Sequence, residues 1–191
     1  MKRKEFFGLI GSHSKEKREE HDFYATVDNE KAIKMLLSYL PDLTNILEPA
    51  CGTGHLSKEL IRNGYKVISS DLIDRGYGEV KDFFNIQKWE GSIVTNPPFK
   101  LAQEFIEHSL KIIPNKQYVC MFLRVLFLEG QKRYELFKKY PPKMIIIASQ
   151  RIHVAKNGDV KKYPHKTLAF AWFIWQKGYK GETIIKWWKD K

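Results

Sequence analysis

The stretch Ser92–Lys100 constrains the fold more than any other part of the chain. Its apolar pair Ile93-Val94 predicts a buried strand, and Pro97-Pro98 must end that strand because proline has no N–H to donate to a sheet. A proline also disfavours helical backbone in the residue before it, so Asn96 leaves the sheet in an extended conformation. The chain then presents Phe99 just before the next helix. In open α/β sheets ligands bind at the carboxyl ends of strands, so these residues predict a functional site.

The tetrapeptide Asn96-Pro97-Pro98-Phe99 resembles the catalytic motif of class I S-adenosylmethionine-dependent methyltransferases that act on exocyclic or amide nitrogens. Adenine-N6 DNA methyltransferases are the best-known members of this group. The resemblance implies that the Asn96 side-chain oxygen and the Pro97 carbonyl hold the two amino hydrogens, so that the nitrogen lone pair points at the methyl group. It also implies that Phe99 stacks on a flipped base. The alternative is a strand-ending turn whose asparagine caps the next helix.

A glycine-containing loop follows the expected first strand, Leu43–Leu47, and leads into an expected helix at Leu56–Arg62. The spacing is not Gly-x-Gly-x-x-Gly, because position 57 is serine. The loop resembles the cofactor loop of class I methyltransferases, in which an acid faces the cationic amino acid part of the cofactor and the glycines allow a close approach. The cofactor contacts that this implies are Glu48, Pro49, Ala50, Cys51, Gly52 and Gly54. No Pro-Cys pair of the cytosine-C5 methyltransferases is present, so Cys51 is interpreted as a small loop residue and not as a nucleophile.

Acidic residues also follow the next predicted strands. Lys66–Ser70 predicts the second strand, and Asp71 at its end can accept hydrogen bonds from both ribose hydroxyls. In the family an acid at the place of Asp82 bonds the adenine amino group, although an ordinary loop carboxylate is the alternative. A Phe-Tyr-Ala-Thr sequence before an expected helix at Asn29–Leu40 resembles the family's N-terminal cofactor motif; core aromatics are the alternative there. The further cofactor contacts implied are Phe23, Tyr24, Thr26, Leu72, Phe83 and Asn96 itself.

The 191 residues, of which 43% are hydrophobic, suffice for one domain with a full core. We expect a flexible, charge-dense arm at residues 1–20 and a single methyltransferase domain at 21–191, without a separate target-recognition domain. Two cysteines fit a reducing cytoplasm, and no apolar run approaches a membrane span. Six histidines without ligand spacing indicate no metal site. We therefore predict a cytoplasmic protein that binds no metal.

The formal net charge of +11 is concentrated in the last third of the chain. Residues 124–191 carry 16 Lys and Arg against 5 Asp and Glu, whereas residues 1–123 carry 17 of each. Such asymmetry predicts a basic face for a polyanion, with a solvated surface that aids solubility as the alternative. The candidate nucleic-acid contacts are Lys100, Arg124, Lys132, Arg133, Arg151, Lys156, Lys161, Lys162 and Lys166.

The remaining pattern completes an α/β series. We expect helices at Leu101–Ile112 and Glu129–Tyr140, buried strands at Tyr118–Leu123 and Met144–Ala148, a long loop at Arg151–His165, and strands at Thr167–Trp175 and Thr183–Trp188. The predicted fold class is α/β, with a Rossmann-like, seven-stranded, mostly parallel sheet, helices on both faces and a C-terminal antiparallel hairpin.

The resemblance implies transfer of a methyl group from S-adenosyl-L-methionine to an exocyclic amino nitrogen, adenine N6 in DNA being favoured, as in the compact enzymes of phage and bacteria. Ribosomal or other RNA, or a protein amide, is the alternative substrate. An alternative of another class is a non-catalytic nucleic-acid-binding module that retains the fold. The expected partner is nucleic acid, DNA before RNA; the sequence does not indicate an oligomeric state.

Overall fold

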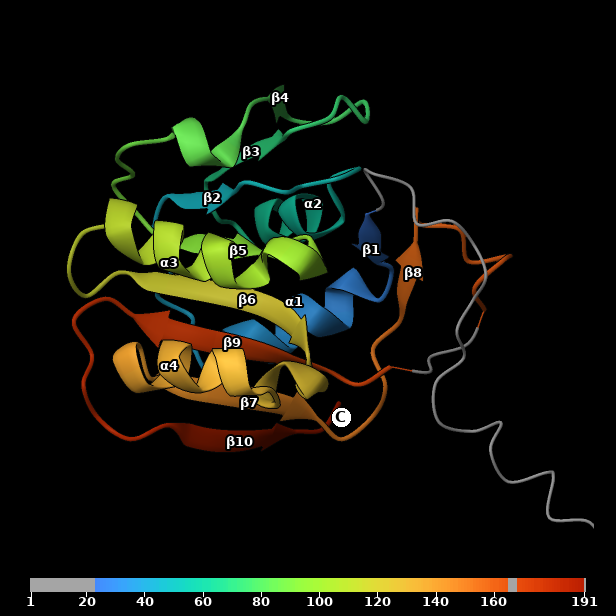
Figure 1. The fold of residues 1–191 in the computed structure, drawn as a ribbon. Helices are drawn as coiled ribbons and strands as arrows, with labels where there is room; N and C mark the ends of the chain where they lie inside the picture. The colour runs from blue at the N-terminus through green and yellow to red at the C-terminus, as the bar shows by residue number, and fades with distance from the viewer. Residues whose placement is uncertain (1–22, 165–167, 191) are drawn as a thin grey trace, which may run out of the picture.

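An eight-stranded sheet forms the centre of the computed structural model, which describes residues 23–164 and 168–190 (Figure 1). Its strands are β2 (Ile46–Glu48), β3 (Val67–Asp71), β4 (Glu79–Val80), β5 (Ile93–Thr95), β6 (Tyr118–Arg124), β7 (Met144–Ala148), β9 (Phe170–Gln176) and β10 (Ile184–Trp188). They lie in the order β10-β7-β9-β6-β5-β2-β3-β4, and all neighbouring pairs are parallel except the two that β9 makes. The predicted α/β fold with a mostly parallel sheet is confirmed.

Helices cover both faces of this sheet, as predicted. Figure 1 shows α3 (Ala102–Ile112) and α4 (Gln131–Lys139) in front of the sheet, and α1 (Asn29–Leu37) and α2 (His55–Arg62) behind it. Three short 3-10 turns, η1 (Phe83–Asn85), η2 (Phe99–Leu101) and η3 (Val125–Leu128), lie in the connections. Each α-helix has an apolar stripe, and the stripes pack into two separate core clusters, one on each face.

Strand β6 shows why a continuous apolar run belongs at the centre of such a sheet. Successive side chains of a strand point to opposite faces. Cys120 and Phe122 therefore join the core cluster of α1 and α2, whereas Val119 and Met121 join the cluster of α3 and α4. A strand that is buried on both faces needs apolar residues at every position, which is the pattern that the sequence carries here.

The number of strands and the pairing at the C-terminal end differ from the prediction. The sheet has eight strands, not seven, and β9 and β10 run in opposite directions without pairing, because β7 lies between them. Six of the seven residues of β9 are buried, so an interior place suits this strand. Four of the five residues of β10 are exposed, so β10 takes the edge and pairs in parallel with β7.

A second, two-stranded sheet was not predicted. Strand β1 (Tyr24–Thr26) pairs antiparallel with β8 (Val154–Lys156), which lies inside the segment that was expected to be a long loop. The expectation of an irregular loop over that whole segment was therefore wrong. The pairing joins residues about 130 positions apart, and nothing in the local sequence signals it.

Within residues 23–164 and 168–190, no helix is long and apolar enough to cross a membrane. The predicted arm at residues 1–20 lies outside the described residues.

Candidate cofactor and active site

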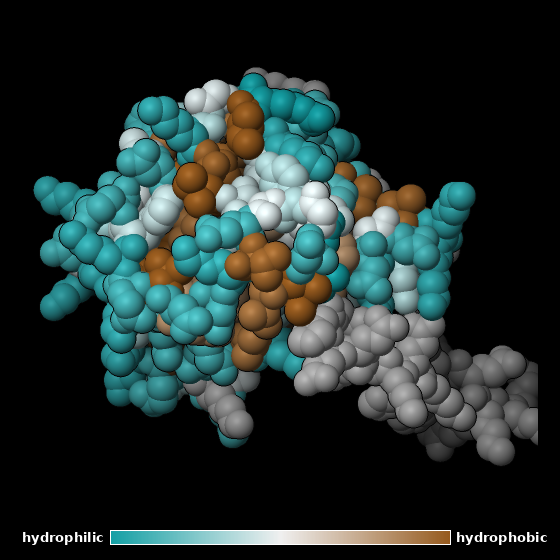
Figure 2. Space-filling model, turned by 90° about the horizontal axis from the view of Figure 1, so that it is seen from above, coloured by the Kyte–Doolittle hydropathy of each residue, from teal (hydrophilic) through white to brown (hydrophobic). Residues whose placement is uncertain are grey.

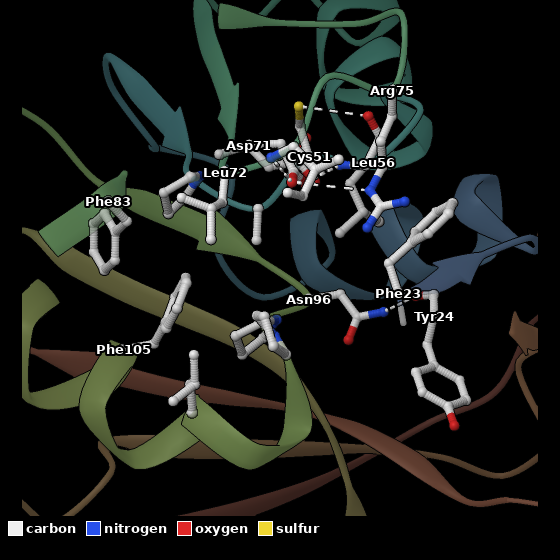
Figure 3. A pocket seen from close by; sticks show the side chains of 18 of the residues that line it. Phe23, Tyr24, Cys51, Leu56, Asp71, Leu72, Arg75, Phe83, Asn96 and Phe105 are labelled. Carbon is white, nitrogen blue, oxygen red and sulfur yellow. Dashed lines mark hydrogen bonds and ion pairs between the residues drawn. The ribbon is translucent and has the colours of Figure 1, made fainter. Parts of the chain in front are cut away.

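A cavity of about 340 Å³ opens where the carboxyl ends of β2, β3 and β5 meet strand β1 (Figure 3). Its volume lies within the range of small-molecule sites. Segments that are far apart in the sequence line the cavity, and they include all of the predicted cofactor and catalytic residues except Gly54 and Phe99. The structure therefore brings together the residues that the sequence motifs had singled out.

Two glycines shape the loop after β2. Gly52 has φ +56° and Gly54 has φ +80°, conformations that disfavour residues with a side chain. A β-carbon at Gly52 would come within 2.9 Å of the Phe23 ring, and one at Gly54 would overlap the Tyr77 ring. Gly54 is also the N-cap residue of α2. Gly54 thus shapes the cavity from behind, although it does not line it.

Glu48 ends β2 with its carboxyl group buried against the helix that follows. Only 2% of the residue is exposed, and the Ser57 hydroxyl donates a hydrogen bond to Glu48 Oε2. Burial raises the pKa of Glu48 to about 8. A cationic group placed beside this carboxyl would favour its ionised form and lower the pKa again.

Asp71, at the end of β3, is held by two backbone amides. Gly52 N donates to Asp71 Oδ2 at 2.8 Å, and Ile73 N donates to Oδ1 at 3.1 Å. Asp82 lies at the start of η1, where its Oδ1 accepts a hydrogen bond from Phe84 N at 2.9 Å. Both carboxylates line the cavity and keep lone pairs for hydroxyl or amino donors of a ligand.

Asn96 follows β5, and its amide nitrogen is fully engaged. Nδ2 donates to the Tyr24 carbonyl at 2.7 Å and to Thr26 Oγ1 at 3.2 Å. The side-chain oxygen Oδ1 is buried and accepts no hydrogen bond from any described residue. Figure 3 shows the amide nitrogen turned toward Tyr24 and the oxygen turned away from it. A buried acceptor without a donor is costly, so this oxygen is able to accept a hydrogen bond from a water or from a bound molecule.

The rest of the tetrapeptide lies at the rim. Pro97 is buried, Pro98 is exposed, and both line the cavity. The Phe99 ring packs on the Tyr24 ring with centroids 4.8 Å apart and 30° between planes. Phe99 lines a second, smaller hollow of about 90 Å³ together with Arg124, Leu126 and Arg133, among others. Its stacking on a flipped base remains a prediction.

The Cys51 thiol has the properties of a structural residue. It is buried, and Sγ lies 3.4 Å from the Tyr77 carbonyl oxygen, to which it can donate. Burial, with a smaller contribution from the nearby Glu48 and Asp71 carboxyls, raises the pKa of Cys51 to about 12. A protonated thiol is a poor nucleophile, which agrees with the interpretation of Cys51 as a small loop residue.

Sequence reasoning missed several residues of the site. Arg75 and Tyr77 come from the turn after β3, Ser57 from α2, and Leu101 and Phe105 from the segment after the tetrapeptide. The Gly76-Tyr77-Gly78 sequence is typical of a turn, but only the tertiary structure folds that turn back over the glycine loop. Figure 3 shows Arg75 next to Phe23 at one end of the cavity and Phe83 and Phe105 at the other.

The described residues among the predicted nucleic-acid contacts lie in three places: at the small hollow beside Phe99, around β8, and on η2. Arg124 and Arg133 meet at the small hollow beside Phe99, where Arg133 Nη1 donates to the carbonyls of Leu126 at 3.1 Å and Glu129 at 2.7 Å. Lys156 lies on β8, and the exposed Lys161 and Lys162 follow it, whereas Arg151 precedes β8 and Lys100 lies exposed on η2. The side chain of Lys132 and the whole of Lys166 lie outside the description.

No cluster of three or more potential metal ligands occurs in the part of the chain that the structure describes.

Comparison with known proteins found similarity to solved structures. No protein-family model and no curated protein matches the chain. Among solved structures, a Listeria monocytogenes protein provisionally assigned as a class I S-adenosylmethionine-dependent methyltransferase matches with a TM-score of 0.59 and 15% identity, over 86% of this chain and 64% of that one. A Pyrococcus horikoshii protein provisionally assigned as an RNA methyltransferase matches with a TM-score of 0.55 and 13% identity, over 78% and 83%.

The M protein of the type I restriction enzyme EcoKI matches with a TM-score of 0.55 and 14% identity, over 81% of this chain and 44% of that one. At such identities the similarity shows the fold alone. The chain therefore has the fold of class I S-adenosylmethionine-dependent methyltransferases, and it spans less than two thirds of the Listeria and EcoKI chains.

Proposed function

We propose that this protein binds S-adenosylmethionine and methylates an exocyclic amino nitrogen, with adenine N6 in DNA as its target. The observation that carries the proposal is the state of the Asn96 amide. Its nitrogen is held by Tyr24 and Thr26, while its buried oxygen, in the wall of the cavity, lacks a donor among the described residues. An amino group is a donor, so it would complete this site.

The residues of the cavity fit the cofactor from end to end. Leu72 and Phe83 would provide apolar walls for the adenine, and the Asp82 carboxylate would accept a hydrogen bond from its amino group. Asp71 offers free lone pairs to the ribose hydroxyls. Glu48 also lines the cavity, and its carboxyl group would bind the ammonium group of the methionine part. When bound, S-adenosylmethionine would supply a methyl group that is bonded to a positively charged sulfur. The methyl carbon is the atom that a nitrogen lone pair would attack.

The chain's own contribution to the reaction is positioning. The Asn96 oxygen and the Pro97 carbonyl would each accept one hydrogen of the amino group, which localises the lone pair on nitrogen and orients it. Tyr24 and Thr26 fix the amide so that it does not rotate. Such orientation lowers the barrier without a covalent intermediate on the protein. The Tyr24 and Phe99 rings at the rim would contact the base that carries the amino group.

DNA is preferred over RNA as the substrate because the tetrapeptide resembles that of adenine-N6 DNA methyltransferases. The structural neighbours do not separate the two, since they include the M protein of a type I restriction enzyme as well as a protein provisionally assigned as an RNA methyltransferase. The excess of Lys and Arg in residues 124–191 disfavours a protein amide as the target. The neighbour that is provisionally assigned as an RNA methyltransferase makes RNA the first competitor to test.

The test is transfer of a tritiated methyl group from S-adenosylmethionine to unmethylated DNA, total RNA or a protein lysate. We expect N6-methyladenine in DNA, with a rate that falls about 100-fold or more in Asn96→Ala because a positioning hydrogen bond is lost, while cofactor binding persists. The exposed Asn115, which precedes β6 at the opposite end of the sheet, provides the matched control, and Asn115→Ala should retain activity.

Label in RNA or protein, and not in DNA, would support the proposed methyl transfer but refute DNA as the substrate. Wild-type protein that binds cofactor but labels none of the three would contradict the proposed activity. Equal activity of Asn96→Ala and Asn115→Ala would contradict the role of the Asn96 amide.

A further inference from the structure

Arg124 ends β6 at the edge of the sheet where the tetrapeptide also lies. β5 and β6 are parallel neighbours with Thr95 opposite Met121, so the residues at the carboxyl ends of both strands lie at the same edge. The Arg124 side chain is half-buried and lines the small hollow beside Phe99. It makes no hydrogen bond, ion pair or ring contact with any described residue. Its guanidinium N–H groups are therefore available to a ligand at this place.

The small hollow has the charge of an anion site. Arg133 also lines it, and its Nη1 is held by hydrogen bonds to the carbonyls of Leu126 and Glu129. The Arg133 guanidinium carbon lies 4.5 Å from the centre of the Phe127 ring, which holds this cation in place. The other described residues that line the hollow are apolar, so no carboxyl group among them neutralises the two arginines. An anion is the ligand that this combination favours.

The cavity and the small hollow differ in charge and in size. The described residues that line the cavity include three with carboxyl groups, Glu48, Asp71 and Asp82, which disfavour a phosphate there. The small hollow has a volume of about 90 Å³, well below the roughly 300–1,000 Å³ of typical small-molecule sites. It therefore suits one small charged group of a larger ligand, and a phosphate group meets this description.

We infer that Arg124 binds a phosphodiester group of the nucleic-acid substrate, next to the nucleotide whose base enters the cavity; the inference rests on the proposed function. Phe99 lines the small hollow and directly follows the two prolines that line the cavity, so the tetrapeptide contributes to both. A nucleotide whose base contacts Asn96 would therefore carry its flanking phosphates close to the small hollow. The planar fork of arginine can donate to both free oxygens of a phosphodiester, a bidentate contact that lysine cannot make.

The competing explanation is that Arg124 is hydrated and only adds to the positive field of the last third of the chain. A general field acts on every phosphate alike, whereas a direct contact concerns one phosphate at a fixed position from the target base. A methylphosphonate linkage removes the charge of a single phosphate and leaves the base sequence unchanged. Moving this linkage along the substrate, one position at a time, therefore separates the two explanations.

The experiment measures kcat/KM for methyl transfer to short DNA duplexes that carry one methylphosphonate, placed in turn at each linkage around the target adenine. We expect one linkage at which the modification lowers kcat/KM of the wild-type chain about 10- to 100-fold, as for a lost charge-assisted hydrogen bond. Arg124→Met should show a loss of similar size on unmodified DNA. It should show no further loss at that linkage, because the contact is already absent.

Three further measurements serve as controls. Arg124→Lys keeps the charge without the planar fork and should give an intermediate loss. Arg62→Met is the matched control and should retain full activity, because Arg62 is an exposed arginine on α2 that pairs with Glu59 at 2.9 Å. The Kd of S-adenosylmethionine, measured by isothermal titration calorimetry, should be the same in Arg124→Met and the wild-type chain, because Arg124 does not line the cavity.

The other outcomes overturn either the inference or the proposed function. Wild-type activity that is indifferent to every methylphosphonate, or lowered equally by all of them, would refute a direct contact. A linkage that is equally sensitive in the wild-type chain and in Arg124→Met would assign the contact to another residue and overturn the inference as well. A wild-type chain that methylates no nucleic acid would refute the proposed function itself. Thermal unfolding identifies any variant that is not folded, and Arg124→Lys then takes the place of Arg124→Met.

Discussion

At the scale of single residues, aromatic rings determine where the glycine loop can lie. The Phe23 ring takes the space beside Gly52, and the Tyr77 ring takes the space beside Gly54. The two rings come from opposite sides of the loop in sequence, one before β2 and one after β3. Two features therefore favour glycine at both positions: the positive φ, and the aromatic ring that occupies the space a β-carbon would take.

A comparison of Gly54 with Gly64 separates the effect of the positive φ from the effect of the neighbouring ring. Both have a positive φ, +80° and +88°, but a β-carbon at Gly64 would meet no atom within 4 Å. Both alanine variants should lose about 1 kcal/mol to backbone strain, and Gly54→Ala should lose about a further 1–3 kcal/mol from overlap with Tyr77. Urea unfolding measures the difference, and Tyr77→Ala in the Gly54→Ala background should recover part of it. Equal losses for the two glycines would mean that the Tyr77 ring moves aside freely.

Burial of the Glu48 carboxyl has a consequence for stability. Its pKa rises from 4.5 to about 8 on folding, so between those values the folded chain holds a proton that the unfolded chain releases. The free energy of unfolding therefore falls as the pH rises through this window, by at most about 1.4 kcal/mol per pH unit, and levels off above it. Glu48→Gln should remove this slope, as measured by urea unfolding at several pH values.

The matched control for that measurement is Glu104→Gln, an exposed carboxyl on α3, which should keep the wild-type slope. An unchanged slope in Glu48→Gln would show that Glu48 is already ionised in the folded chain at neutral pH.

At the scale of elements, strand β1 connects the Asn96 amide to β8, which lies in the basic last third of the chain. The carbonyl and hydroxyl that hold the Asn96 amide belong to Tyr24 and Thr26 of β1. On its other side β1 pairs with β8, and the His153 carbonyl accepts hydrogen bonds from Val27 N at 2.9 Å and Asp28 N at 3.2 Å. The position of Asn96 thus depends on a pairing with residues far along the chain.

Loosening the end of this pairing should reduce activity. Asp28 Oδ2 accepts a hydrogen bond from His153 N at 3.0 Å, and Asp28→Ala removes that acceptor. We expect faster amide hydrogen exchange in β1 and β8 and a several-fold lower kcat, because local unfolding of β1 frees the Asn96 amide. Hydrogen exchange measured by mass spectrometry checks the first effect. Asp42→Ala, an exposed carboxylate before β2, is the control, and equal exchange in the two variants would refute the connection.

At the scale of the whole molecule, hydrophobic and basic surfaces are both distributed unevenly. Figure 2 looks down on the β4 end of the sheet and shows hydrophobic side chains in a band across a mainly hydrophilic face. Exposed apolar residues on β3, β4 and the loops that follow them include Ile68, Leu72, Val80 and Phe84. The excess of positive charge lies elsewhere, in residues 124–191, which contain β8 and provide part of the lining of the small hollow beside Phe99.

This distribution predicts a salt-dependent affinity for nucleic acid. Lys161 and Lys162 are exposed and follow β8, so neutralising both should weaken DNA binding and lower the slope of log Kd against log salt by about one per lost phosphate contact. Fluorescence anisotropy at several salt concentrations measures the slope. The control replaces Lys66 and Lys111, exposed lysines outside the basic third of the chain, by glutamine. Equal slopes in the two double variants would contradict a nucleic-acid role for the segment after β8.

The sequence by itself determined the features that depend on neighbours along the chain. Pro97-Pro98 ends β5 because proline cannot donate to a sheet, and the glycines turn the chain after β2 because they tolerate a positive φ. The apolar run of β6 placed that strand in the interior. These local rules were enough to predict an α/β sheet with candidate residues at its carboxyl edge, and nearly all of those residues do line one cavity.

Only the tertiary structure decided what depends on contacts between distant segments. The pairing of β1 with β8, the place of β7 between β9 and β10, and the return of Arg75 to the cavity all join residues with no shared local signal. The orientation of the Asn96 amide and the raised pKa of Glu48 likewise follow from which atoms surround each side chain. Backbone pairing and burial depend on which partners fold nearby, and spacing along the chain does not reveal those partners.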